Sequence, residues 1–192
     1  MKLKRRDFIR QLCYACGTVT LIPACTTKFS MWRFLSEEEA NLIEVITEQF
    51  IPADQDAGAT EARVVNFFDK QLTGYYVRHQ ETYRNGLNSV ETSAQKLFGA
   101  SFRDIQWEDQ THVLELMEKG ELPAENWQDV DQRTFFNLML DHTMQGFYGS
   151  PRHGGNCDYV SYKMMKIDYP HIIGQNRYDA GSKGVQSKKE AS

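Results

Sequence analysis

Two histidines and two aspartates near the C-terminal end of the chain have the clearest capacity for chemistry. His142 follows Asp141 directly, and His153 lies five residues before Asp158. Imidazole and carboxylate groups can hold a metal ion or act as an acid–base pair. Their spacing matches no established ligand motif, and His142 falls among apolar residues at helical spacing. The pattern favours a histidine at the edge of the core that makes one hydrogen bond, with the metal or acid–base site as the alternative.

Nucleophilic or cofactor chemistry would need residues that the sequence does not bring together. Cys157 is followed by Asp158, and a neighbouring carboxylate disfavours the reactive thiolate. The chain contains no Gly-x-Ser-x-Gly motif. Gly154-Gly155 lacks the other glycines of a dinucleotide-binding loop and follows no predicted strand. We therefore expect no catalytic residue, no metal ligand and no cofactor-binding residue in this chain.

The N-terminal segment resembles an export signal rather than a reaction site. Arg5, Arg6 and Phe8 lie in Lys4-Arg5-Arg6-Asp7-Phe8-Ile9-Arg10, which is typical of a twin-arginine export signal. The uncharged stretch that follows is too short and too polar to span a bilayer. We assign residues 1–24 to this signal and 25–35 to a linker. Twin-arginine export moves folded proteins, so the signal predicts a periplasmic protein that folds, or binds a partner, before export.

The end of the signal also resembles a lipoprotein cleavage box. Leu21-Ile22-Pro23-Ala24-Cys25-Thr26 has an apolar residue three positions before the cysteine and a small residue directly before it. Cys25 is then a candidate lipid anchor that would associate the protein with a membrane. Two alternatives stay open, namely ordinary signal cleavage nearby and a cysteine that merely belongs to the apolar stretch.

Composition limits what the mature chain can be. Removing residues 1–24 takes away five basic residues and one acidic residue, so the net charge falls from −4 to −8. Such an acidic protein is a poor nucleic-acid binder. Only Cys25 and Cys157 remain, which excludes a disulfide framework. One hydrophobic core of ordinary domain size is expected.

Hydrophobic periodicity predicts a mainly α fold of about five helices with no substantial sheet. Ser36-Glu37-Glu38-Glu39 forms a capping box, so a helix should begin there and end near Phe50. Thr60 is the predicted cap of a second helix that Gly74 ends. The further helices are expected over about 78–98, 109–118 and 130–143, and Gly120 with Pro123 should stop the second of these.

The third helix is predicted in more detail from its residues. The third is expected to bury Tyr83, Leu87, Val90, Ala94 and Leu97 and to end at Gly99, although Asn85-Gly86 argues against an unbroken helix.

After Thr143 the amino-acid composition of the chain changes. Residues 146–156 are rich in glycine, aromatic and polar residues, which predicts a long shaped loop, and 159–165 can form one or two further helical turns. The helical domain is assigned to 36–176. Residues 177–192 contain almost no large apolar side chain and predict a disordered tail.

Arg152 in Pro151-Arg152-His153-Gly154-Gly155-Asn156 has two readings. Glycine permits close approach of another surface, and arginine and aromatic side chains anchor interfaces. Alternatively, the loop folds over the protein's own helices, with Arg152 and Asn156 satisfying its carbonyls. The residues alone leave both readings open.

With these motifs in view, the chain resembles the gluconate 2-dehydrogenase subunit 3 family over roughly residues 35–170. The resemblance rests on Phe50-Ile51-Pro52-Ala53-Asp54 with Gly58-Ala59, on residues 146–156 and on Tyr169-Pro170. The chain departs from the family pattern at Ser150 and His153, where an acidic and an aromatic residue are usual.

The resemblance implies a non-catalytic small subunit of a large FAD-dependent sugar or polyol dehydrogenase of the glucose–methanol–choline class. The FAD would belong to that large subunit, and a cytochrome c subunit carrying haem c could complete the complex. The small subunit would stabilise the large one and escort it through the twin-arginine translocase. The family's glycine-rich block implies an interface formed by Phe147, Tyr148, Pro151, Arg152, Gly154, Gly155 and Asn156.

Two other functions remain as alternatives to the accessory subunit. One is a self-contained periplasmic metal or histidine enzyme that uses His142 and His153. The other is a lipid-anchored binding protein without a redox partner.

Overall fold

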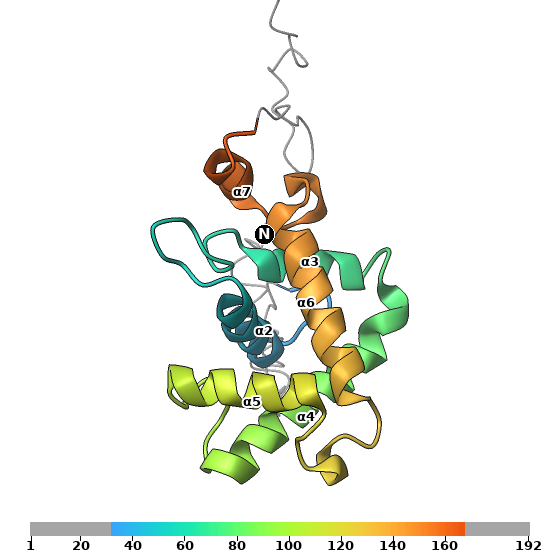
Figure 1. Cartoon of the computed structure of the whole chain (residues 1–192). Coiled ribbons are helices and arrows are strands. Elements are labelled where there is room, and N and C mark those ends of the chain that lie inside the picture. Colours follow the sequence, from blue (N-terminus) through green and yellow to red (C-terminus); the bar gives the residue numbers. More distant parts are fainter. Residues whose placement is uncertain (1–31, 168–192) are drawn as a thin grey trace, which may run out of the picture.

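The computed structural model describes residues 32–167, and over this range the chain forms a single small domain of helices without strands (Figure 1). The predicted mainly α fold is therefore confirmed. Arg5, Arg6, Phe8, Cys25 and the predicted tail 177–192 lie outside the described residues. Within the range that is described, no helix combines the length and apolar character needed to cross a bilayer.

Six α-helices and four short 3-10 turns make up the described chain. The α-helices are α2 (Glu37–Phe50), α3 (Val64–Leu72), α4 (Gln80–Phe98), α5 (Trp107–Lys119), α6 (Gln132–Tyr148) and α7 (Val160–Met164). The 3-10 turns are η1 (Val77–His79), η2 (Ala124–Asn126), η3 (Pro151–His153) and η4 (Cys157–Tyr159).

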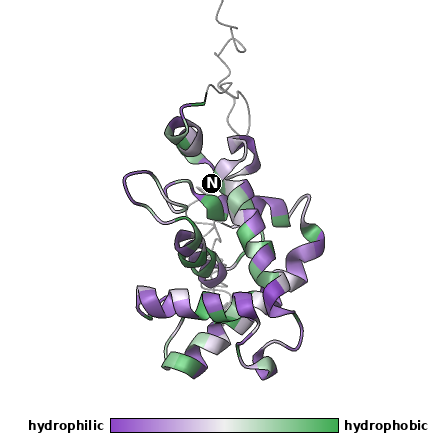
Figure 2. Ribbon diagram, in the orientation of Figure 1, coloured by the Kyte–Doolittle hydropathy of each residue, from purple (hydrophilic) through white to green (hydrophobic). Residues whose placement is uncertain are grey.

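Helix α6 is the central element of the domain. It contacts α2, α3, α4, α5 and α7, and it runs from α7 at one end of the molecule to α5 at the other (Figure 1). Phe135, Met139 and Phe147 on α6 are almost completely buried. Polar and apolar residues are segregated around the helices (Figure 2), as amphipathic packing around one core requires.

Local end signals predicted several helix boundaries correctly. Ser36 Oγ accepts a hydrogen bond from the Glu39 amide at 3.1 Å, and the Glu39 carboxylate accepts one from the Ser36 amide at 2.8 Å. Gly99 and Gly120 end α4 and α5 with φ of 72° and 71°. These interactions depend only on neighbouring residues, which explains why the sequence reveals them.

The predicted start of the second helix was wrong. Helix α3 begins at Val64, after Arg63 in the left-handed conformation with φ 51°. The Thr60 amide donates to Glu48 Oε2 at 2.8 Å, and the Ala59 amide donates to the Ile51 carbonyl at 2.9 Å. These contacts with the end of α2 hold residues 59–63 in turns rather than in a regular helix.

The third helix also differs from its prediction in detail. Leu97, expected in the core, is 43% exposed. Helix α4 continues through Asn85-Gly86 without a break, and a Cβ at Gly86 would lie 2.3 Å from the Phe135 ring. Gly86 thus lets α4 approach α6 closely, and this packing outweighs the low helix propensity of glycine.

The predicted loop over 146–156 was wrong in its first part. Helix α6 continues to Tyr148, and a Cβ at Gly146 would lie 3.0 Å from Val64 Cγ1 and 3.1 Å from Phe67 Cβ. Gly146 is therefore a helical residue at a close contact between α3 and α6. The sequence could not distinguish such a glycine from one that ends a helix.

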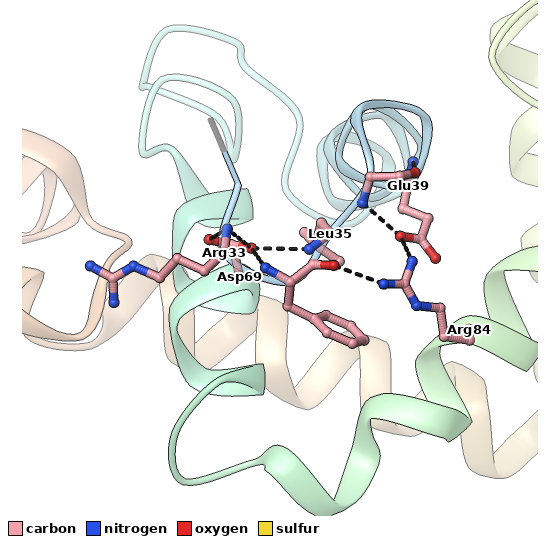
Figure 3. A network of polar contacts seen from close by, with 7 residues as sticks. Arg33, Leu35, Glu39, Asp69 and Arg84 are labelled. Atoms are coloured by element: carbon pink, nitrogen blue, oxygen red, sulfur yellow. Dashed lines mark hydrogen bonds and ion pairs between the residues drawn. The ribbon is translucent and has the colours of Figure 1, made fainter. Parts of the chain in front are cut away.

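A buried carboxylate ties the start of the described chain to the core. Asp69 on α3 accepts hydrogen bonds from the amides of Arg33, Phe34 and Leu35 at 2.9–3.1 Å (Figure 3). The Phe34 carbonyl accepts from Arg84 at 2.8 Å. The Arg84 guanidinium also pairs with Glu39 and lies 4.3 Å from the centre of the Phe34 ring. Residues 33–35, assigned to a linker from the sequence, are thus held by α3 and α4.

Replacing Asp69 by asparagine should destabilise the domain, because an NH2 group in place of Oδ2 would face the Arg33 amide and the neutral amide oxygen is a weaker acceptor than the carboxylate. We expect Asp69→Asn to lower the free energy of unfolding by about 2–3 kcal/mol in chemical denaturation. Hydrogen exchange of the amides of residues 33–35 should also accelerate. The exposed Asp129→Asn is the matched control and should change stability by less than about 0.5 kcal/mol. Equal stability of both variants would contradict the anchoring role.

Candidate functional site

The glycine-rich segment after α6 lies directly on the backbones of α3 and α6. A Cβ at Gly154, whose φ is 122°, would lie 2.5 Å from the Asn66 carbonyl oxygen. A Cβ at Gly155 would lie 2.2 Å from the Gly146 carbonyl oxygen. Both glycines are therefore required for packing within this chain.

Asn156 fixes the same segment through its side chain. It is fully buried with φ 48°, donates to the Gly149 carbonyl at 2.8 Å and accepts from the Ser161 amide at 3.0 Å. The amide of Cys157, which is also buried, donates to the Ala62 carbonyl at 2.9 Å. The segment from Gly149 to Ser161 is thus locked to the core by its own polar groups.

The predicted interface residues divide into an interior and a surface group. Two members carry exposed side chains, Tyr148 and Arg152. Gly154 is partly buried, and the interior members are Phe147, Pro151, Gly155 and Asn156. The interior residues support the surface, so a direct contact with a partner stays a prediction for Tyr148 and Arg152.

Two loop carbonyls are satisfied from α3 rather than by Arg152, whereas Asn156 satisfies the Gly149 carbonyl as expected. Lys70 Nζ donates to the Arg152 carbonyl, and Gln71 Nε2 donates to the His153 carbonyl at 3.0 Å. The Arg152 Nε contacts His153 Nε2 at 3.1 Å. The reading in which the loop folds over its own helices is therefore correct for the backbone, with Lys70 and Gln71 in the role expected of Arg152.

An aromatic cleft of about 450 Å³ opens beside this loop. Its walls come from the end of α3, the turn that follows it, the end of α6 and the first residues of the loop. The lining residues are Phe67, Gln71, Tyr75, Tyr76, Gln145, Gly149, Ser150 and His153. The cleft therefore joins segments that are about eighty positions apart in the sequence.

Sequence reasoning missed five cleft residues, Phe67, Gln71, Tyr75, Tyr76 and Gln145, of which the two adjacent tyrosines had a visible signal. Tyr75 is 73% exposed, and Val77 beside it is 55% exposed. The available signal was the run Tyr75-Tyr76-Val77 just after the glycine at the end of a helix, where polar residues are usual. An apolar run at such a position indicates either a buried turn or a binding surface.

His142 lies buried beneath the Tyr76 ring, which separates it from the cleft. The two rings stack with centres 4.1 Å apart, and His142 Nδ1 lies 2.7 Å from the Tyr83 hydroxyl. Burial, followed by the nearby His79 and Arg78, lowers the pKa of His142 to about 4. Burial also raises the pKa of Tyr83. The prediction of a core histidine with one hydrogen bond is confirmed.

Burial first, and neighbouring cations second, lower the pKa values of the two histidines nearest the cleft. The pKa of His153 is lowered by burial and then by the charges of Arg152 and Lys70. The pKa of His79 is lowered by burial and then by Arg78. Cations that shift these pKa values also raise the potential felt by a bound partner.

The sequence-predicted candidates for metal chemistry are used in packing. His142 stacks with Tyr76 and bonds to Tyr83, and His153 contacts Arg152. Among residues 32–167 no group of three or more His, Cys, Asp or Glu side chains is arranged to hold a metal ion.

A second cleft, of about 430 Å³, lies between α2, α4 and residues 101–103. Its charged lining includes Glu38, Glu39, Arg84, Glu91 and Arg103. Arg84 is already engaged by Glu39 and the Phe34 carbonyl, so this cleft shares these two charged residues with the contacts that anchor the N-terminal segment.

Comparison with known proteins gives one match. The model of a family described as gluconate 2-dehydrogenase subunit 3 matches residues 37–168. No curated protein and no solved structure shows significant similarity to the chain.

The lowered pKa of His142 predicts a pH-dependent stability. The unfolded chain protonates this histidine below about pH 6.5, whereas the folded protein resists protonation until about pH 4. The stabilisation is therefore present above pH 6.5 and is lost as the pH falls towards 4. The difference between the folded pKa of about 4 and the ordinary 6.5 corresponds to about 3 kcal/mol.

Denaturation of the wild type and of His142→Gln at several pH values checks this. Glutamine can still bond to the Tyr83 hydroxyl but does not titrate, so the variant should lose less stability on acidification than the wild type. If the stability of the two proteins changed with pH in parallel, the lowered pKa of His142 would not be the source of the pH dependence.

Proposed function

The chain belongs to the gluconate 2-dehydrogenase subunit 3 family, and we propose that it is the non-catalytic small subunit of a large FAD-dependent sugar or polyol dehydrogenase. The observation that carries the proposal is the family match, which spans all six described α-helices. The large subunit would be of the glucose–methanol–choline class and would hold the FAD and the catalytic base. A cytochrome c subunit with haem c could accept its electrons.

The site supports a role in binding rather than in catalysis. Its distinctive glycines and Asn156 are used to fix a surface loop, and His142 is enclosed by aromatic rings. What reaches the surface is a preorganised set of aromatic and cationic side chains, which are the types that anchor protein interfaces. The alternative metal or histidine enzyme would require His142 and His153 to be available, and both are engaged within the protein.

We further propose that the chain escorts the large subunit to the periplasm. Arg5, Arg6 and Phe8 would supply the twin-arginine address for a folded complex, and Cys25 is a candidate for lipid attachment at the membrane. The anchoring of residues 33–35 to Asp69 gives the start of the domain a firm attachment to its core.

The accessory role is tested by purifying the full chain through a C-terminal affinity tag from its native host. We expect a larger protein to co-purify, to show a flavin absorption spectrum and to oxidise a sugar or polyol. A second tagged periplasmic protein serves as the control for non-specific capture. Recovery of the chain alone as a monomer would contradict the proposal and favour a binding protein without a redox partner.

The escort role is tested by replacing Arg5 and Arg6 together by lysine and fractionating the cells. The flavoprotein and its dehydrogenase activity should remain in the cytoplasm, because the translocase recognises the arginine pair. Arg10→Lys makes the same change outside the pair and should leave export unchanged. Periplasmic activity in the double variant would show that the large subunit travels independently.

A further inference from the structure

We propose that the aromatic cleft between residues 71–79 and 145–153 is the docking surface for the large subunit, and that its occupant is an acidic segment bearing an apolar or aromatic side chain. The inference rests on the proposed function and specifies which surface and which chemistry perform it. It replaces most of the interface expected from the sequence, whose residues largely lie inside the protein.

The apolar character of this surface is the first observation. Tyr75, Val77, Met144 and Tyr148 are four of the eight large apolar side chains that are exposed in the described chain. Tyr75 lines one wall and Val77 follows it two residues later, while Met144 and Tyr148 lie on the last turns of α6, one residue before and three after Gln145, which lines the other wall. Isolated exposed apolar residues are ordinary, but a group around a cleft indicates a binding surface.

The charges around the cleft indicate the chemistry of the segment that would occupy it. Of the described residues that line the cleft, none is acidic. The Lys70 ammonium donates to the Arg152 carbonyl next to Gln71 and His153, which line the cleft, and the Arg78 guanidinium lies 5.8 Å and 6.0 Å from the ring centres of Tyr75 and Tyr76. The remainder of the protein is acidic overall. A partner that carries carboxylates around an apolar side chain would complement this surface and be steered towards it.

The cleft is already in a binding-competent shape. The Tyr76 hydroxyl donates to Gln145 Oε1 at 2.6 Å, which joins the two walls, and the Tyr76 ring stacks on His142. Gln71 holds the His153 carbonyl at 3.0 Å on the third side. Because these groups are fixed before binding, little conformational entropy is lost when a partner docks.

A second copy of this chain fits the cleft poorly in a symmetric pair. A two-fold interface places the same patch on both subunits, so Lys70, Arg78 and Arg152 would face their own counterparts. Such like-charge contacts are unfavourable. The acidic segment is therefore expected on a different chain.

The test measures the affinity of the full chain for the large flavoprotein that co-purifies with it. Tyr75→Ser removes an exposed apolar anchor, and Arg152→Glu reverses a charge at the rim. We expect each to raise the Kd at least about tenfold. The wild-type affinity should fall with ionic strength, and this dependence should weaken in Arg152→Glu.

Matched controls lie on the opposite part of the molecule. Leu97→Ser changes an apolar residue that is 43% exposed on α4, and Arg103→Glu reverses a charge in the second cleft. Both should leave the Kd within about twofold of the wild type, as is usual outside an interface. Thermal denaturation of all four variants checks that each remains folded.

The outcomes separate this inference from the proposed function. If the wild type binds the flavoprotein and both cleft variants bind equally well, the docking surface is wrong while the accessory role stands. If the wild type forms a dimer in light scattering that the cleft variants abolish, the occupant is a second copy and the inference fails. If the wild type neither binds the flavoprotein nor copurifies with one, the proposed function itself is overturned.

Discussion

The close contact of the 154–155 backbone with α3 and α6 is the constraint on which the rest of the structure depends. Gly154 lies against Asn66, Gly155 lies against Gly146, and Gly146 itself lies against Val64 and Phe67. Three glycines thus bring two helices and a loop to backbone distance. Any side chain at these positions would separate the layers, and with them the walls of the aromatic cleft.

One turn of α3 connects this packing to residues 33–35 at the start of the described chain and to the loop at residues 152–153. Asp69 holds the amides of residues 33–35, while the neighbouring Lys70 and Gln71 hold the loop carbonyls of Arg152 and His153. The segment that leads from the proposed export signal and the proposed partner surface are therefore fixed to the same helix. An accessory subunit that carries a partner through a membrane would need such a firm connection.

The parts of the fold that the sequence predicted are those controlled by local chemistry. The Ser36 capping box and the glycines at 99 and 120 act on adjacent backbone, so their patterns could be recognised directly. Gly86 and Gly146 were misread because their role is contact with a distant helix. Tyr75 was missed for a related reason, since its significance comes from α6 and residues 149–153 across the cleft. Four of the residues first assigned to an interface, Phe147, Pro151, Gly155 and Asn156, are buried within the chain, and a contact of the exposed Tyr148 and Arg152 with a partner stays a prediction.

Hydrogen exchange of this chain, free and in complex with the flavoprotein, tests the central claim most directly. The account predicts slower exchange on binding for the amides of residues 71–79 and 145–153, with α5 unchanged. Slower exchange confined to α5, or identical exchange in the free and bound chain, would contradict the claim that this end of the molecule holds a partner.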